Sequence, residues 1–311
     1  MTVRAPEDLI AFAPIAAGFR PADSVVMLSL RSPGGGPHAR VGLPAGPQDV
    51  GELADVLVSA ARRNDVAVVA FLVYGEDSPL VRAVADTLDR EFTAAGVEVY
   101  DILRVEKDCW FPLVPGHPVD ALAGVPYDVS THPFTLEAIL RGRVVRGGRD
   151  EVEALVRPAP GAGLLPERLL DRAVPLGKGR VTEVVQRHLD ARTRLSDAEL
   201  AAVAVSVVDP SMRDECWSWL DRSSARDAVD LWTDAVGRLP DEWVGDVAAV
   251  LALVAWLSGD GALAWCAVDR CLDVQDHNSL ASLVAQLLHG SVSPDVWERP
   301  DGQLGGPPPA A

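Results

Sequence analysis

The N-terminal half of the chain contains four side chains suited to ligand recognition: Tyr74, Arg104, Trp110 and Tyr127. Aromatic faces beside a fixed positive charge form an amphipathic pocket that suits a planar or anionic small molecule. Tyr74 follows one apolar run of residues, and Arg104 lies near the end of the next run. In an open α/β sheet, ligands bind outside the carboxyl ends of the parallel strands. The residue types and their spacing therefore predict a ligand site that consists of Tyr74, Gly75, Arg104, Trp110, Tyr127 and Asp128.

The histidines and cysteines of this region form no recognisable metal-binding pattern. Cys109, His117 and His132 are separated by seven and fourteen intervening residues. That spacing matches no zinc motif, even with Asp120 or Asp128 as a further ligand. We therefore predict neither a metal site nor a bound cofactor.

The residues needed for nucleophilic or acid–base catalysis also form no complete group in the sequence. Asp23 and Ser24 have no G-x-S-x-G motif and no histidine nearby in the sequence, so we expect them to satisfy backbone groups of a turn. The paired carboxylates Glu76 and Asp77 would suit acid–base chemistry if Arg104 or His117 faced them, and a solvated turn is the simpler interpretation. We predict no catalytic residue.

The elements that must position these side chains form a three-layer α/β pattern. Residues 66–73 are continuously apolar, which is typical of a strand covered on both faces. The expected order is helix 6–17, hairpin strands 24–31 and 38–43, helix 48–63, strand 66–73, helix 79–95, strand 97–105 and helix 131–139. The Pro/Gly-rich segment 109–133 is expected to be a long loop, either a lid over a ligand or a structural cover. The fold class is thus a mixed sheet that starts with a hairpin, with helices on both faces.

From residue 196 onward the pattern is helical throughout. Capped helix starts recur at Ser196, Asp209, Pro240 and Ser293. Ala264, Cys271 and Leu272 have the spacing of packing positions in a tetratricopeptide helix, so stacked helix pairs and an ordinary bundle are both compatible with the pattern. All six Phe precede residue 135, whereas seven of the eight Trp lie between Trp217 and Trp297. This segregation favours two cores, with an α/β domain at 1–157, a linker and connecting helix at 158–195, an acidic helical domain at 196–299 and a disordered tail at 300–311.

Charge and cysteine usage limit the partners and the compartment. The formal net charge is −17, and the residues from 195 onward include 19 acidic and 6 basic side chains. Such a module repels phosphate backbones, so we expect no nucleic-acid partner. The chain has no run of about 18 apolar residues and no secretory signal, so we expect no membrane association. Four cysteines without C-x-x-C spacing favour reduced thiols in a cytoplasm.

Several motifs together resemble one family. They are the segment from Gly18 to Val26, the segment from Arg40 to Pro44, Tyr74-Gly75, the segment from Gly124 to Asp128 and the segment from Trp256 to Ala264. In order and spacing they resemble the actinobacterial family called domain of unknown function 4192, from Leu9 to Trp297. The resemblance implies a cytoplasmic bacterial protein of a family with no assigned activity.

Two functional hypotheses follow from the sequence. The leading one is a non-enzymatic binding or scaffold protein whose helical half engages a protein partner or a second copy of the chain, because no catalytic set is complete and tryptophan is abundant there. The alternative is an enzyme or small-molecule sensor that uses the cleft at the carboxyl ends of the parallel strands.

Overall fold

The computed structural model describes residues 3–32, 36–159, 161 and 163–297. The predicted disordered tail, 300–311, lies outside the described residues. The chain forms two compact units, one of Met1–Val152 with His289–Ser293 and one of Glu153–Leu288 with Pro294–Ala311.

A six-stranded mixed sheet organises the first unit, in the order β2-β1-β3-β4-β5-β6. The strands are β1 (Ser24–Arg31), β2 (Ala39–Gly42), β3 (Val68–Tyr74), β4 (Glu98–Glu106), β5 (Cys109–Pro112) and β6 (Val125–Pro126). β1 is antiparallel to both β2 and β3, and β3 is parallel to β4. The predicted opening hairpin and mixed sheet are therefore confirmed.

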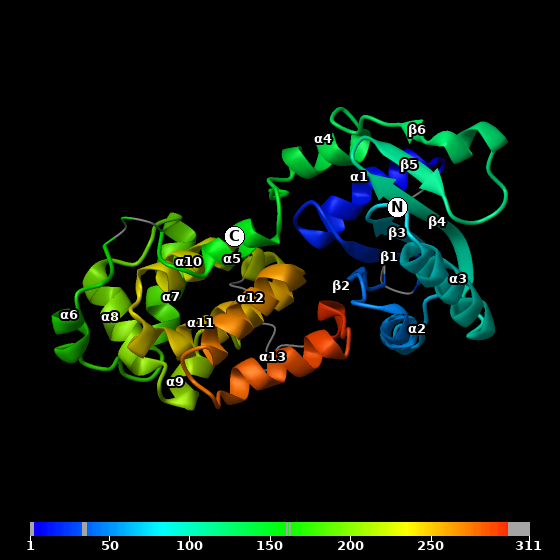
Figure 1. Cartoon of the computed structure of the whole chain (residues 1–311). Helices are drawn as coiled ribbons and strands as arrows, with labels where there is room; N and C mark the ends of the chain where they lie inside the picture. Colours follow the sequence, from blue (N-terminus) through cyan, green and yellow to red (C-terminus); the bar gives the residue numbers. More distant parts are fainter. Residues whose placement is uncertain (1–2, 33–35, 160, 162, 298–311) are drawn as a thin grey trace, which may run out of the picture. The chain divides into compact units, whose positions relative to one another are not determined.

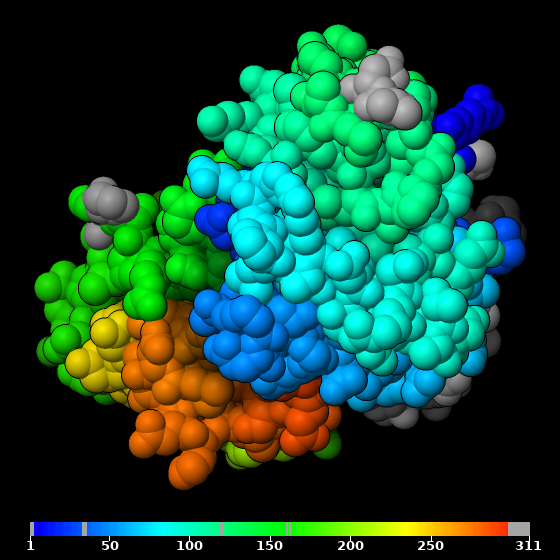
Figure 2. Space-filling model, turned by 45° about the vertical axis from the view of Figure 1, so that its right-hand side comes forward, coloured from blue at the N-terminus to red at the C-terminus, as the bar shows by residue number. Residues whose placement is uncertain are grey.

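Helices cover both faces of this sheet (Figure 1). On one face, α2 (Val50–Arg63) and α3 (Pro79–Ala94) pack against alternate residues of β1 and β3, including Met27 and Phe71. On the other face, α1 (Pro6–Ala17) packs against Val26 and Leu72. Figure 2 shows α2 and α3 at the surface, coloured blue and cyan. Because consecutive strand residues face opposite sides, two separate cores form and the unit has three layers.

The segment 109–133 contributes two strands where the sequence predicts a loop. β5 is antiparallel to β4, and β6 is antiparallel to β5. Each strand is short, and each contains a proline, so neither has the alternating run that identifies a strand in sequence. The helix that follows, α4 (Pro133–Leu140), packs on α1, where the Phe12 and Phe134 rings meet edge to face.

A one-residue bulge interrupts the pairing of β3 with β4. Val69 pairs with Val99 and Ala70 pairs with Asp101, so Tyr100 has no partner on β3. After the bulge, Asp101 and Leu103 face α1, whereas Ile102 and Arg104 face α2 and α3. The bulge thus places Tyr100 as an extra residue beside Asp101.

The second unit is helical. Its central helix, α11 (Asp241–Ser258), has an unbroken buried stretch from Val247 to Leu257. The helices α10 (Arg222–Arg238) and α12 (Gly261–Leu272) pack along it. The side chains of Ser196 and Asp209 cap α8 and α9 as predicted, whereas α11 begins after Pro240 without a side-chain cap. Stacked tetratricopeptide-like pairing stays a prediction. The helices from α5 onward are α5 (Arg149–Leu155), α6 (Glu167–Asp171), α7 (Arg180–Ala191), α8 (Asp197–Ser206), α9 (Pro210–Asp214), α10 (Arg222–Arg238), α11 (Asp241–Ser258), α12 (Gly261–Leu272) and α13 (Ser279–His289).

The stretch 158–195, predicted as a linker and a connecting helix, contains two helices of the second unit within its described residues. It includes α6 and α7, in which Leu170, Val181 and Val185 are fully buried. All four cysteines lie in described segments, three of them buried, and none forms a disulfide. Among the described residues, no helix is both long enough and apolar enough to cross a bilayer.

Candidate functional site

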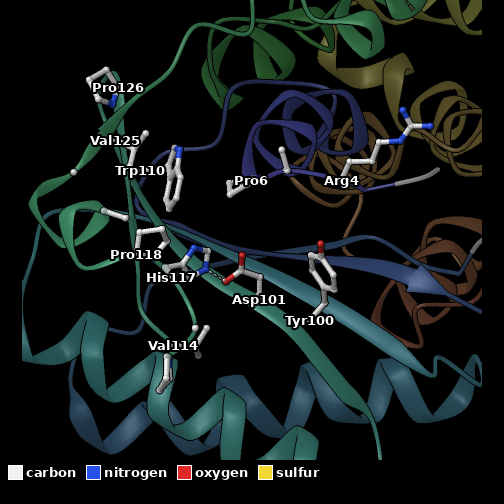
Figure 3. A pocket seen from close by; sticks show the side chains of 15 residues that line it. Arg4, Pro6, Tyr100, Asp101, Trp110, Val114, His117, Pro118, Val125 and Pro126 are labelled. Carbon is white, nitrogen blue, oxygen red and sulfur yellow. Dashed lines mark hydrogen bonds and ion pairs between the residues drawn. The ribbon is translucent and has the colours of Figure 1, made fainter.

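A cavity of about 750 Å³ lies in the first unit, between the N-terminal end of α1 and strands β4 and β5 (Figure 3). Its floor is polar, with Asp101 and His117, and its walls are largely aromatic or proline side chains. The lining residues are Arg4, Ala5, Pro6, Tyr100, Asp101, Trp110, Val114, Pro115, Gly116, His117, Pro118, Ala121, Gly124, Val125 and Pro126. A concave, mostly apolar site with a few convergent polar groups is the usual form of a small-molecule site.

The polar centre of the cavity is a hydrogen-bonded pair of side chains, Asp101 and His117. Nε2 of His117 lies 3.0 Å from Oδ1 of Asp101, and Asp101 is 6% exposed. Burial raises the pKa of Asp101, and the hydrogen bond from His117 offsets part of that rise. When Asp101 is ionised its oxygens are acceptors, so Nε2 of His117 carries the hydrogen.

Trp110 fixes the other side of the imidazole. The two ring centroids are 5.5 Å apart, with the rings inclined at 63°. Nε1 of Trp110 donates a hydrogen bond to Oε1 of Glu7 on α1, at 3.2 Å. Trp110 thus contacts both Glu7 of α1 and His117, and His117 lies between Trp110 and Asp101.

Tyr100 and Arg4 complete the mouth of the cavity. Figure 3 shows Tyr100 pointing from β4 towards α1 beside Asp101, whereas the guanidinium of Arg4 turns away from Asp101. Tyr100 is 47% exposed, since the bulge places it outside the regular ladder. Both side chains are thus accessible to a ligand that enters the cavity.

Three of the residues predicted to form a site share the α1 face of the sheet. Tyr74, Trp110 and Tyr127 belong to one apolar cluster. The hydroxyl of Tyr127 donates to the backbone oxygen of Lys107 at 3.0 Å. The hydroxyl of Tyr74 is buried without a partner among the described residues, and burial raises its pKa. Of these three, Trp110 lines the cavity.

Arg104 and Gly75 lie elsewhere. Arg104 faces α2 and α3, where its guanidinium pairs with Glu106, lies 3.4 Å from the backbone oxygen of Gly75 and stacks 3.8 Å from the centroid of the Phe111 ring. The sheet thus separates Arg104 from Tyr74 and Trp110. Asp128 is exposed, and the hydrogen bond from the backbone N–H of Ser130 lowers its pKa, as in a turn. The six residues are thus not brought together, and their joint ligand role stays a prediction.

The other reactive side chains have local partners. Asp77 pairs with Arg82 at the surface, which fits the solvated-turn interpretation. His132 pairs with Asp8, and among the described residues no three His, Cys, Asp or Glu side chains are grouped so as to hold a metal ion. The hydroxyl of Ser24 is buried with no hydrogen-bond partner in the described segments, so the expectation that it caps the turn is wrong.

Asp101 was missed by the sequence reasoning, although a signal for it exists. It is the single acidic residue in the stretch from Val99 to Val105, which is otherwise dominated by apolar side chains. A carboxylate inside a buried strand is costly unless it is paired, so such a residue marks a partner that arrives from elsewhere in the chain. Here that partner is His117, which sequence reasoning had considered as a metal ligand.

The fold and the cavity together define a class of protein in which a mixed-sheet α/β unit with a polar cavity precedes a helical unit. The chain belongs to the family described as Domain of unknown function (DUF4192), whose model matches residues 6–295. The resemblance seen in the sequence motifs is therefore confirmed for the family. No curated protein and no solved structure matches the chain.

Proposed function

We propose that the α/β unit binds a planar small molecule in the cavity over β4 and β5. The observation that supports this most directly is the buried Asp101–His117 pair on the cavity floor. Removing a carboxylate from water costs on the order of several kcal/mol, unless a partner group compensates for the lost hydration. A carboxylate whose pKa is raised by burial and which has a specific partner in a cavity is a candidate for a functional site.

The shape and composition of the walls indicate the ligand chemistry. Trp110, Tyr100 and four prolines offer flat apolar surfaces, while His117, which is held by Asp101, offers a hydrogen bond at one end. A planar ring with a polar edge satisfies both. Arg4 at the mouth gives an anionic substituent a partner, which agrees with the planar or anionic ligand expected from the sequence.

Truncation of Tyr100 provides the test. Thermal unfolding of the full chain is measured with and without a panel of planar aromatic acids and neutral heteroaromatic compounds. A ligand at about 100 times its Kd stabilises a protein by about 2.7 kcal/mol, which raises the Tm by several degrees. We expect Tyr100→Ala to remove most of that rise without changing the ligand-free Tm, since Tyr100 is half exposed.

The matched control is Leu140→Ala. Leu140 lies on α4, is 87% exposed and does not line the cavity, so its truncation removes a similar apolar surface. The control variant should keep the full ligand response. An equal ligand response in wild type and Tyr100→Ala would place the binding site elsewhere.

A protein partner for the helical unit stays a prediction with weaker support. The seven tryptophans from Trp217 to Trp297 are all buried or half-buried, so none presents an exposed indole to a partner. The stacked helix pairs, the cytoplasmic location and the actinobacterial origin likewise stay predictions.

A further inference from the structure

His117 differs from two other histidines that pair with carboxylates in the described part of the chain. His132 uses Nε2 for Asp8 and Nδ1 for the backbone N–H of Phe134. His188 uses Nε2 for Glu199 and Nδ1 for the hydroxyl of Thr193. In both, the two ring nitrogens are occupied, as expected of a structural imidazole.

His117 has one ring nitrogen left. Nε2 is paired with Asp101, and the described residues provide no hydrogen bond to Nδ1. The side chain is 19% exposed and lines the cavity, so a ligand can reach it. With the hydrogen on Nε2, Nδ1 carries a lone pair and can accept a proton.

We propose that His117 is a general base for proton transfer at carbon, and that the substrates are small planar carbonyl compounds with an acidic C–H next to the carbonyl. This inference rests on the proposed function and adds a reaction to it. Nδ1 takes the proton from that carbon, and the C–H electron pair moves to form an enolate and an imidazolium. The imidazolium then returns the proton to the enolate oxygen, so the net reaction is a keto–enol isomerisation that needs no co-reactant. Return of a proton to carbon instead regenerates the ketone, and in deuterated water it exchanges the C–H hydrogen for deuterium.

The composition of the cavity favours this reaction class over others. The described lining side chains include no Ser, Thr, Cys or Lys, so a covalent intermediate on one of those groups is not provided for. A proton shift, in contrast, needs one base and a hydrogen-bond donor for the enolate oxygen. The hydroxyl of Tyr100, which also lines the cavity, is suited to be that donor.

Asp101 is a positioning residue in this scheme. Its carboxylate fixes the tautomer and the orientation of His117, and it stabilises the imidazolium that forms. It does not contact the substrate in this proposal. Its removal should therefore change both the rate and its pH dependence.

The test measures solvent deuterium exchange at the methylene group of phenylpyruvate by NMR, with the full-length protein. Phenylpyruvate is planar in its enol form, carries a carboxylate and has an acidic C–H between its ring and its carbonyl. We expect wild type to accelerate exchange, and His117→Gln to lose at least about 100-fold of that acceleration, since general base catalysis contributes roughly 10²–10⁴-fold. Asp101→Asn should lose a smaller factor and move the pH–rate profile to lower pH, because the imidazolium is no longer stabilised.

The matched control is His132→Gln, which breaks a histidine–carboxylate pair of the same geometry that does not line the cavity. It should keep the wild-type exchange rate. Calorimetric binding of phenylpyruvate and far-UV circular dichroism, recorded for each variant, separate loss of chemistry from loss of binding or folding. If wild type binds phenylpyruvate but exchange stays at the buffer rate, or if His117→Gln retains the rate, the reaction is wrong and the binding function stands. If wild type does not bind it, the reaction proposed here is wrong for this substrate class, and the panel of other planar compounds decides the binding function separately.

Discussion

The guanidinium of Arg104 is held by three groups within its own layer: the carboxylate of Glu106, the backbone oxygen of Gly75 and the face of the Phe111 ring. The residue is 5% exposed. A buried charge with such partners stabilises the fold locally and is not available to a ligand on the opposite face of the sheet.

We therefore expect Arg104→Met to lower the free energy of unfolding by about 1–3 kcal/mol, because it removes a charge-assisted hydrogen bond and a cation–π contact. The ligand-induced Tm rise should survive in the same variant. Thermal unfolding with and without a ligand of the cavity measures both effects. Loss of the ligand response in Arg104→Met, with a normal response in Tyr100→Ala, would instead support a site around Arg104.

At the scale of single residues, the sequence identifies aromatic and charged candidates for a ligand site. It does not show which of these residues lie together in one site. Trp110 was chosen for its type and does line the cavity. The face on which each residue lies depends on strand register, and the bulge at Tyr100 changes the alternation within β4. No local sequence pattern predicts that bulge. The placement of Arg104 and Trp110 on opposite faces of the sheet therefore could not be derived from the sequence.

Among the elements, α8 shows a stabilisation that depends on pH. Ser196 and Glu199 form a capping box at its start, and His188 of α7 pairs with the same carboxylate. Hydrogen bonds from Ser196 and the neighbouring His188 lower the pKa of Glu199 to about 2. The folded state therefore binds this proton more weakly than the unfolded state does. The resulting stabilisation is present above the unfolded pKa of 4.5 and is lost as the pH falls towards 2.

Glu199→Gln keeps the capping geometry and removes the charge. The variant should be less stable than wild type at pH 7 by about 1–2 kcal/mol, a value reduced for a side chain that is 30% exposed. The difference should shrink as the pH falls from about 4.5 to about 2. Urea unfolding across this range measures it, with the exposed Glu183→Gln as the control. A difference that stays constant over this range would contradict the assignment.

The predicted elements of the first unit agree with the structure wherever the hydrophobic pattern is long. The helices around 6–17, 48–63 and 79–95 and the strands around 24–31, 66–73 and 97–105 all form, with ends shifted by one or two residues. The sequence pattern did not predict β5 and β6, because their pairing depends on tertiary contacts. One such contact is at Gly124, where φ is +97° and an added Cβ would lie 2.6 Å from the Phe111 ring.

At the scale of the whole molecule, the two units differ in their aromatic residues. Seven tryptophans belong to the helical unit and Trp110 to the α/β unit. We expect Phe71→Ala, at a fully buried position of the sheet, to destabilise the α/β unit by about 3–5 kcal/mol. Circular dichroism should then show an earlier unfolding step, while the main tryptophan fluorescence transition keeps its midpoint. A common shift of both signals would show that the two units unfold as one.

The bulge in β4 has a consequence for how such a cavity can arise. Because Val99 already faces α2 and α3 and Asp101 already faces α1, removal of Tyr100 would leave a regular ladder in which each neighbour keeps its present partner. Tyr100 is therefore a single extra residue that adds a wall to the cavity and leaves the pairing of its neighbours unchanged. Deletion of Tyr100 should therefore remove this wall of the cavity and keep the sheet intact.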